Sequence, residues 1–453
     1  MGGWGVASGG RAGYVCFAAQ DWWYHNRAHS DVQLMLKLAE QRPVLFVNSI
    51  AMRMPLPGRS SQPLRRILRK ARSMARKVQR PVPGLPGFAV MTPVLLPFYG
   101  SRTARALNAR LIALQVRLAA RSLRMSTDVC VATIPTAADV VEHLPHRTLV
   151  YNRSDRHSAF PEADTASVEV LERRLMATAD HVLYVSGELM AAERELTGDR
   201  AVFLDHGVDL EHFAAEGSPE PADLAAIARP RIGFFGALDD FVVDFDLLAR
   251  VAKEHPDAQL VLIGDTTADL GALTGLPNVH HLGFRPYAEI PSYGRGFDVA
   301  LMPWLDNDWV RHCNPIKLKE YLALGLPVVS TDFPEVRRYR EQIAVAGTAE
   351  EFGEAVGAAL AASASASASA SASASASASA HGVDAAAAAQ RRRAAVAADS
   401  WAARAGELLD LVEGPKTRAQ GPAADDRTPT AGTPAPPAKS QVPTAEAQAP
   451  TAG

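Results

Sequence analysis

Short apolar runs alternate with amphipathic stretches along most of this chain, and the alternation occurs twice. In the first half the apolar runs are GYVCFAA, PVLFVNS, DVCVATI, RTLVYN, HVLYVS and AVFLDHG. The second half repeats the arrangement with RIGFFGA, QLVLIGD, VHHLGF, DVALMPW and PVVST. Strands rich in Val and Ile that alternate with helices are typical of a parallel sheet covered on both faces. The sequence therefore predicts an α/β fold with two successive doubly wound, Rossmann-like domains, each with a crevice for a ligand.

Composition divides the chain further. Pro, Gly and Glu gather between the two alternations, which is typical of a linker. Ala and Ser then alternate strictly over residues 362–380, a composition too small and polar to form a core. We interpret this repeat as an expanded linker; a modified serine tract is the alternative. The predicted parts are a first domain 1–213, a linker 214–230, a second domain 231–360, an Ala-Ser linker 361–384, a C-terminal helix 385–413 and a disordered tail 414–453.

The net charge of −2 hides a strong asymmetry along the chain. Between Glu40 and Asp128 there are 17 Lys and Arg and no acidic residue. Such a region favours an anionic partner. Within residues 59–80, the stretch 64–78 has apolar residues at helical spacing and basic residues between them. A basic amphipathic helix of this kind fits an anionic membrane surface. The predicted membrane contacts are Arg65, Arg66, Arg69, Lys70, Arg76 and Lys77.

The pattern of the basic segment also fits a second structure. A helix packed on the core with a solvated cationic face would have the same spacing of apolar and basic residues. Nucleic acid is disfavoured as the partner because no aromatic platform or known binding motif accompanies the charges.

Cysteine usage and the chain's apolar stretches bear on the compartment. Cys16, Cys130 and Cys313 form no paired spacing, which argues against a disulfide framework or a zinc site. No charged segment followed by an apolar core opens the chain, so no signal peptide is expected. The apolar stretch 88–99 is too short for a bilayer and contains two prolines. We expect a cytoplasmic protein that is peripheral on the inner face of the membrane.

The stretch NPIKLKEYLALGLPVVSTD, residues 314–332, combines groups suited to a polar ligand. Pro315 fits the start of a helix, and Gly325 predicts its end. Lys317 and Glu320 lie three residues apart, on one edge of that helix. A helix start with free backbone donors, cations and a carboxylate suits a ligand that has both phosphate and hydroxyl groups.

Two glycines in RIGFFGALDD open the second domain. Gly233 and Gly236 are expected at a strand-to-helix turn, where a glycine lets backbone approach a phosphate. Tight packing is the competing interpretation, because this spacing is common.

Aromatic residues and histidines follow the first strand of the first domain. The loop QDWWYHNRAHSD suggests the wall of a ligand crevice, since aromatic rings stack on sugar faces. Core packing of the two tryptophans accounts for the pattern equally well. The acceptor-side candidates are Trp22, His25 and His29.

Several of these segments resemble one enzyme family. NPIKLKEYLALGLPVVST is similar to the nucleotide-sugar motif of GT-B glycosyltransferases of family 4, in particular a branch of teichuronic acid type. LDHGVDLEHF, ATADHVLYVSGELM and LPNVHHLGFRPYAEIPSYGRGFDVALMP resemble other segments of the same family. The resemblance extends over residues 14–360.

The resemblance implies a function and a set of roles. The protein would transfer a sugar from a nucleotide-diphosphate donor to a cell-envelope glycan or lipid-linked acceptor, with retention and without a metal or cofactor. Glu320 would bind the ribose hydroxyls, and Lys317 would neutralise the leaving group. The helix start would hold the diphosphate. The nucleotide-sugar contacts are then Gly233, Gly236, Asn314, Pro315, Ile316, Lys317 and Glu320.

The chain also departs from the family pattern. His312 stands eight residues before Glu320, where the family has its first glutamate, and is a candidate for contact with the sugar. Asp306 or Asp308 is the alternative source of that carboxylate. The basic pair expected after the first strand of the second domain is absent, so Arg285 or Arg311 would have to meet the diphosphate.

The departures leave other functions open. In the first domain Asp155 aligns with a family loop that faces the cleft, and it is a catalytic or acceptor-contact candidate. A sugar-nucleotide epimerase on the same scaffold is one alternative function. A non-catalytic, membrane-docked partner of a polysaccharide assembly complex is the other.

Overall fold

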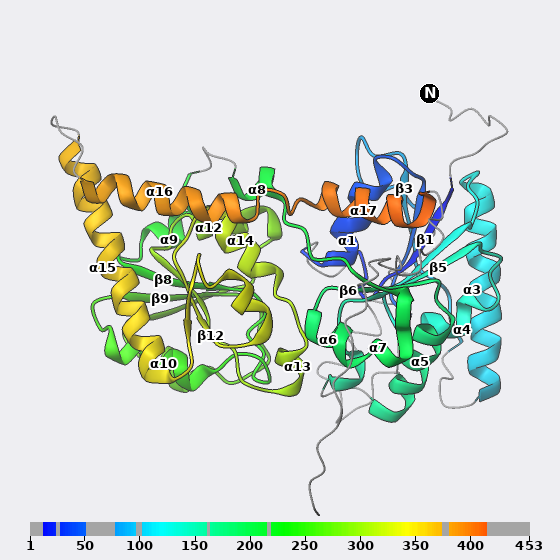
Figure 1. Cartoon of the computed structure of the whole chain (residues 1–453), viewed down its shortest axis with the longest axis horizontal. Coiled ribbons are helices and arrows are strands. Elements are labelled where there is room, and N and C mark those ends of the chain that lie inside the picture. The colour runs from blue at the N-terminus through cyan, green and yellow to red at the C-terminus, as the bar shows by residue number, and fades with distance from the viewer. Residues whose placement is uncertain are drawn as a thin grey trace, which may run out of the picture. The chain divides into compact units, whose positions relative to one another are not determined.

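Seven parallel strands form the first sheet of the computed structural model, which describes residues 12–23, 28–50, 78–96, 102–160, 164–214, 219–373 and 380–414. The strand order is β3-β2-β1-β4-β5-β6-β7. Helices cover both faces of this sheet (Figure 1). The strands are β1 (Tyr14–Phe17), β2 (Val44–Val47), β3 (Phe88–Met91), β4 (Val129–Ala132), β5 (Thr148–Arg153), β6 (His181–Tyr184) and β7 (Ala201–Phe203).

The second sheet has six parallel strands in the order β10-β9-β8-β11-β12-β13. In each sheet the chain runs outward in one direction and then restarts from the middle, between β1 and β4 and between β8 and β11. Ligands of doubly wound sheets bind at such switch points, outside the carboxyl ends of the strands. These strands are β8 (Arg231–Phe235), β9 (Gln259–Ile263), β10 (Val279–Gly283), β11 (Val299–Met302), β12 (Val328–Thr331) and β13 (Ala344–Ala346).

Helices connect the strands in both halves. In the first they are α1 (Ser30–Ala39), α3 (Arg102–Ser122), α4 (Ala137–Val141), α5 (Thr165–Thr178), α6 (Gly187–Ala192) and α7 (Arg194–Thr197). In the second they are α8 (Leu210–Ala214), α9 (Ala222–Ala225), α10 (Phe245–Glu254), α11 (Gly271–Thr274), α12 (Ile290–Gly294), α13 (Asp308–Arg311) and α14 (Ile316–Leu324). The chain continues with α15 (Ala349–Ser373), α16 (Ala380–Ala395) and α17 (Trp401–Glu413).

The cores follow from the apolar runs. All four residues of β1 are buried, and so are all four of β2, because both strands lie inside a sheet that is covered on two sides. Alternate residues of β1 therefore belong to different cores, Val15 to one face and Cys16 to the other. The predicted fold, two Rossmann-like parallel-sheet domains, is confirmed.

The Ala-Ser repeat differs in part from the expected linker. Helix α15 begins before the repeat and continues into it as far as Ser373. Alanine has the highest helix propensity, and a helix that is already nucleated extends at little cost, so the first part of the repeat stays helical.

The last two helices, α16 and α17, each contact a different half of the chain. Arg393 at the end of α16 donates a hydrogen bond to the carbonyl of Leu324 in α14. At the end of α17 the Glu413 carboxylate accepts hydrogen bonds from Tyr14 Oη (2.8 Å) and from the Arg42 guanidinium. These helices, orange in Figure 1, thus contact both halves of the chain.

Some predicted contacts lie outside the described residues. They are the basic residues Arg65, Arg66, Arg69, Lys70, Arg76 and Lys77, together with His25. Within the parts of the chain that the structure describes, no helix has the length and apolar character needed to cross a membrane.

Candidate functional site

Helix α14 begins at the switch point of the second sheet. Pro315 is its N-cap in an extended conformation, and Gly325 ends it with φ +80°, as the sequence predicted. The first backbone N–H groups of any helix lack intrahelical acceptors, so this end offers donors to an anion. Gly236 follows β8 and Trp304 follows β11, the two strands that flank the switch point, and Lys317 contacts both residues.

Lys317 holds its ammonium against aromatic rings rather than against a carboxylate. Its Nζ lies 4.6 Å from the centre of the Phe234 ring and 5.4 Å from that of Trp304. No hydrogen bond or ion pair to another described residue is made by this Nζ. Burial lowers the pKa of Lys317 to about 8, although the charge of Glu320 opposes this shift. A cation held without a counter-ion at a helix start is suited to an anionic ligand.

Glu320 lies one turn further along the same helix and is 6% exposed. Burial raises the pKa of its carboxyl to about 8, against the attraction of Lys317. Across the described ranges, no donor reaches this carboxylate. A buried acceptor pair of this kind is expensive unless hydroxyl or amide donors from a ligand satisfy it.

The two predicted glycines have different surroundings. Gly233 lies within β8, and a Cβ there would overlap the Phe297 ring, so close packing accounts for it. Gly236 lies at the end of the strand with φ +141°, and a Cβ there would overlap Lys317 Nζ. Gly236 thus makes room for the ammonium of Lys317. Only the second glycine lies at the expected turn.

Asn314 and Lys319 are engaged by a buried carboxylate that sequence reasoning missed. Asp205, just after β7, accepts hydrogen bonds from Asn314 Nδ2 (2.8 Å) and from the Arg338 guanidinium (2.8 Å). Lys319 Nζ lies 3.0 Å from Asp205 and 2.8 Å from Asp399, and it is fully buried. No local pattern identifies these partners, because Asn314 and Asp205 are 109 residues apart. The Asn314 side chain therefore anchors the helix start, and a ligand would meet its backbone.

The other charged candidates for the diphosphate are already paired. Arg285 donates to the Asp223 carboxylate and to Tyr293 Oη (2.7 Å). Arg311 donates to both carboxylate oxygens of Asp306. Both arginines therefore have a carboxylate partner. Among the described residues, Lys317 is the cation nearest in sequence to the start of α14 that has none.

His312 lies at the end of α13, on the rim of a hollow. Its Nδ1 is 2.7 Å from the Asp308 carbonyl, so Nδ1 carries the proton when the ring is neutral and Nε2 can accept. The hollow has a volume of about 190 Å³, and the rest of its lining comes from the end of β5, the loop after it, and the segment that carries α5, α6 and α7. Asp308 is bound by Arg156 (2.8 Å), a residue of the first half.

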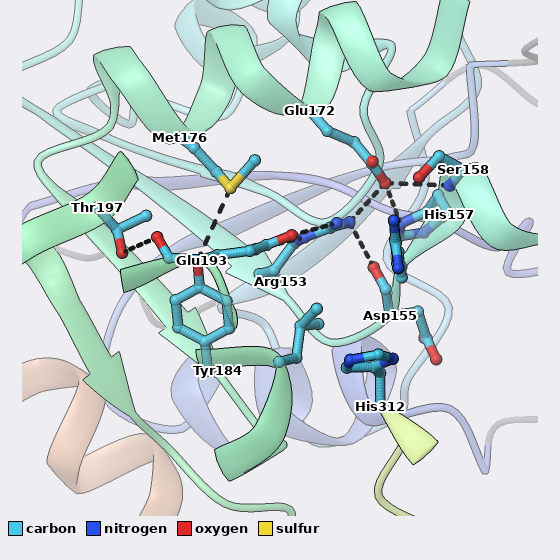
Figure 2. A network of polar contacts seen from close by, with 12 residues as sticks. Arg153, Asp155, His157, Ser158, Glu172, Met176, Tyr184, Glu193, Thr197 and His312 are labelled. Carbon is cyan, nitrogen blue, oxygen red and sulfur yellow. Dashed lines mark hydrogen bonds and ion pairs between the residues drawn. The ribbon is translucent and has the colours of Figure 1, made fainter. Parts of the chain in front are cut away.

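Arg153, which lines the same hollow, is the centre of a network of polar contacts (Figure 2). Arg153, at the end of β5 and 1% exposed, bonds the carboxylates of Glu172 and Glu193. It also donates to the carbonyl of Asp155 (2.7 Å), and the Glu172 carboxylate accepts from the Ser158 N–H (3.2 Å). This network fixes the loop that carries Asp155.

Asp155 lies within electrostatic range of Cys313, three residues before α14. Burial raises the pKa of its carboxyl, and the neighbouring His157 works in the opposite direction. Burial also raises the pKa of Cys313, and the charge of Asp155 adds to that shift, which places the carboxylate near the residue before Asn314. The pKa of His157 is lowered to about 4 by burial, so its ring is neutral near pH 7. Two acidic groups of the first half thus lie near the start of α14: Asp205 is bonded to Asn314, and Asp155 acts on the neighbouring Cys313.

The two acceptor-side candidates that the structure describes, Trp22 and His29, have different surroundings. Trp22 is 5% exposed and packs against the rings of Phe46 and Phe88, with ring centroids 6.1 and 5.0 Å apart, which is the core-packing alternative. His29 is the partly exposed N-cap residue of α1.

An aromatic group borders the site. Phe160 of the first half lies 5.8 Å from the Trp309 ring and 6.3 Å from the Phe241 ring. Trp309 lies in turn 6.2 Å from Trp304. Among the described residues, neither indole N–H has an acceptor, although both are buried.

The second half of the chain matches the model of a known protein family. Residues 229–362 match the family model described as Glycosyl transferases group 1. Over 196 residues the chain is 28% identical to TuaH of Bacillus subtilis (strain 168), provisionally named a teichuronic acid biosynthesis glycosyltransferase. That match covers 42% of this chain and 49% of TuaH, so it spans about half the length of the relative.

Solved structures share the architecture. Sucrose-phosphate synthase from Thermosynechococcus elongatus has a TM-score of 0.62 at 14% identity, over 88% of this chain and 98% of that one. Anabaena HepE, solved in complex with UDP and glucose, has a TM-score of 0.58 at 15% identity, over 88% and 99%. At these identities the likeness shows the fold. The chain has the GT-B fold, is homologous to a teichuronic acid biosynthesis glycosyltransferase, and carries a glycosyl transferases group 1 domain in residues 229–362.

Proposed function

We propose that this protein transfers a sugar from a nucleotide-diphosphate donor to a cell-envelope glycan or lipid-linked acceptor. The observation that carries the proposal is the pair formed by Lys317 and Glu320. Both are ionisable groups without a partner among the described residues, and burial moves the pKa of each to about 8, from opposite directions. Perturbed groups of opposite charge on one helix edge, at a switch point, are typical of a ligand site.

The donor would use α14 from its start to its second turn. The backbone N–H groups of Ile316 and Lys317, with the helix dipole, would hold the diphosphate. The Lys317 ammonium would stabilise the charge that grows on the leaving phosphate. The Glu320 carboxylate would accept the two ribose hydroxyls. Because Gly236 has no side chain, the diphosphate could approach the backbone closely there.

The sugar and the acceptor would meet the remaining candidates. His312 Nε2 would accept a hydrogen bond from a sugar hydroxyl, in the place of the family's first glutamate. Asp155 would orient the acceptor hydroxyl, and its raised pKa suits a group that takes up a proton. Retention at the anomeric carbon and independence of metal belong to the same proposal.

The comparisons favour a transferase over an epimerase or a non-catalytic partner. The matched family is a glycosyltransferase family, TuaH is named for teichuronic acid biosynthesis, and HepE was solved with UDP and glucose. Nothing in these matches favours either alternative. The envelope acceptor rests on the name of TuaH, and membrane contact by Arg65, Arg66, Arg69, Lys70, Arg76 and Lys77 stays a prediction from the sequence.

Turnover measured on a single-residue variant tests the proposal. We expect Glu320→Ala to lose at least about tenfold in kcat/KM for the nucleotide-sugar donor, because two hydrogen bonds to a charged group are lost. Glu341→Gln changes an exposed glutamate of the same domain and should leave turnover unchanged. Wild-type turnover by a folded Glu320→Ala protein would remove the ribose assignment. The anomeric configuration of the product, read by NMR, would decide retention.

A further inference from the structure

Helix α3 has two apolar faces, and described residues cover only one of them. Ala109, Ile112, Val116 and Ala120 are buried against the first sheet. On the opposite side Leu107, Leu114 and Leu118 are 52%, 51% and 55% exposed. Their spacing of seven and four residues places the three leucines in one stripe along the helix.

The segment after β3 widens this stripe. Gln115 pairs its side-chain amide with both backbone groups of Val94, at 2.9 Å for each bond. Asn108 does the same for Leu96, at 2.8 and 3.1 Å. Because alternate residues of an extended segment point to one side, Val94 and Leu96 are presented together, and they are 46% and 37% exposed. We call Val94, Leu96, Leu107, Leu114 and Leu118 the α3 outer face.

This clustering is unusual among the described residues. Nine large apolar side chains are strongly exposed there, and five of them belong to the α3 outer face. Single exposed apolar residues need no explanation, whereas a contiguous patch marks an interaction site.

Cations border the patch on one side. On a helical projection Arg110, Arg117 and Arg121 lie next to the leucine stripe, and all three are exposed. None of them makes an ion pair with a described residue, in contrast to Arg105, which is bound by Asp139. The chain has no acidic residue from 41 to 127 that could neutralise them.

We propose that the α3 outer face docks on an anionic phospholipid bilayer, with its apolar side chains in the interface and the three arginines among the headgroups. A helix apolar on one side and cationic on its flank gains from both burial and attraction at such a surface. The three arginines on its flank favour lipid over a protein partner, since anionic headgroups can neutralise all of them at once. This inference does not depend on transferase activity, and it uses residues other than the basic segment predicted from the sequence.

Vesicle binding by the full chain tests this inference. We expect co-sedimentation with vesicles of phosphatidylglycerol and phosphatidylcholine, and little with phosphatidylcholine alone. The triple variant R110Q/R117Q/R121Q should bind about a hundredfold more weakly, since each arginine near the surface contributes about fivefold. The triple variant L107Q/L114Q/L118Q should lose on the order of tenfold or more. Val170→Gln, a 64% exposed residue on α5, should bind as the wild type does.

Other occupants of the face would give different results. Gln suits a helix and the replaced leucines are half-exposed, so melting temperatures should stay within a few degrees of the wild type. A large drop in melting temperature would show that another part of the chain covers the face. Loss of a dimer in the leucine variant would show that a second copy does. Either result, or vesicle binding that neither triple variant weakens, would overturn the proposal.

Discussion

Lys317 and Lys319 stand two residues apart on α14 and have opposite surroundings. Lys319 is fully buried and bound by two carboxylates and by the carbonyl of His206 (2.6 Å). Lys317 faces aromatic rings and Gly236 and has no counter-ion among the described residues. A helix turns by about 200° over two residues, so the two lysines lie on nearly opposite sides of α14. One of them contributes to stability and the other is available to bind a ligand.

Methionine at each lysine position should separate these two roles. Lys319→Met leaves Asp205 and Asp399 without their shared cation, so we expect it to lower the free energy of unfolding by about 3–5 kcal/mol. Lys317→Met removes a half-buried charge that has no counter-ion among the described residues, so it should leave stability unchanged or higher while turnover falls. Denaturant unfolding monitored by circular dichroism measures both. Equal destabilisation by the two variants would contradict the assignment.

Glu320 should make stability depend on pH. Its pKa is raised from the ordinary 4.5 to about 8, so the folded protein keeps this proton after the unfolded chain has lost it. The folded state is therefore penalised increasingly between pH 4.5 and 8, and the penalty is constant above pH 8. Glu320→Gln should match the wild type near pH 4.5 and exceed it by on the order of 4 kcal/mol at pH 8. A difference in unfolding free energy that is independent of pH would refute the raised pKa.

At the scale of elements, the β8 end and the α14 start form one unit. Gly236 closes the strand with a positive φ, and its missing side chain leaves room for Lys317. Bonds from the first sheet hold the helix start in place, since Asn314 Nδ2 also donates to the carbonyl of Val185 (2.8 Å). The position of Lys317 therefore depends on both halves of the chain.

Alanine substitutions at two glycines can separate backbone strain from contact with Lys317. Gly236→Ala should impair donor binding by about tenfold or more, because the new Cβ occupies the position of Lys317 Nζ. Gly283→Ala also introduces positive-φ strain, at φ +73°, with no atom within 4 Å of the new Cβ. It should lower stability by about 1 kcal/mol and leave binding intact. Nucleotide titrations of both variants decide this; equal loss of affinity would assign the effect to strain.

Much of the fold could be predicted from periodicity, and helix α3 shows where that fails. The apolar run GYVCFAA contains strand β1, and the helix end predicted at Gly325 is observed. Helix α3 was not predicted, because its apolar residues occupy two opposite faces and blur the amphipathic signal. Strand β3 was likewise predicted only as an apolar stretch.

At the scale of the whole molecule, contacts distant in sequence hold the candidate site. The Glu335 carboxylate accepts from the Gly187 N–H (2.7 Å), and Asp205 binds Arg338 and Lys319. The chain passes close to itself where Gly207 meets Trp401, since a Cβ there would stand 2.6 Å from the indole. Lys317 and Glu320 were predicted from local spacing, whereas Asp205 was not, because its partners arrive only with the tertiary fold.

The central claim is that Glu320 and Lys317 form a nucleotide-diphosphate site. The most direct measurement is isothermal titration calorimetry of the full chain with UDP, GDP, ADP and TDP, in buffers of different ionisation enthalpy. We predict that one nucleotide binds selectively at pH 7 and releases protons, because the ribose hydroxyls favour the charged form of Glu320 and lower its pKa from about 8. Glu320→Gln should lose that proton release together with most of the affinity, and Glu341→Gln should lose neither. Binding of none of the four nucleotides, or undiminished binding by Glu320→Gln, would contradict the account.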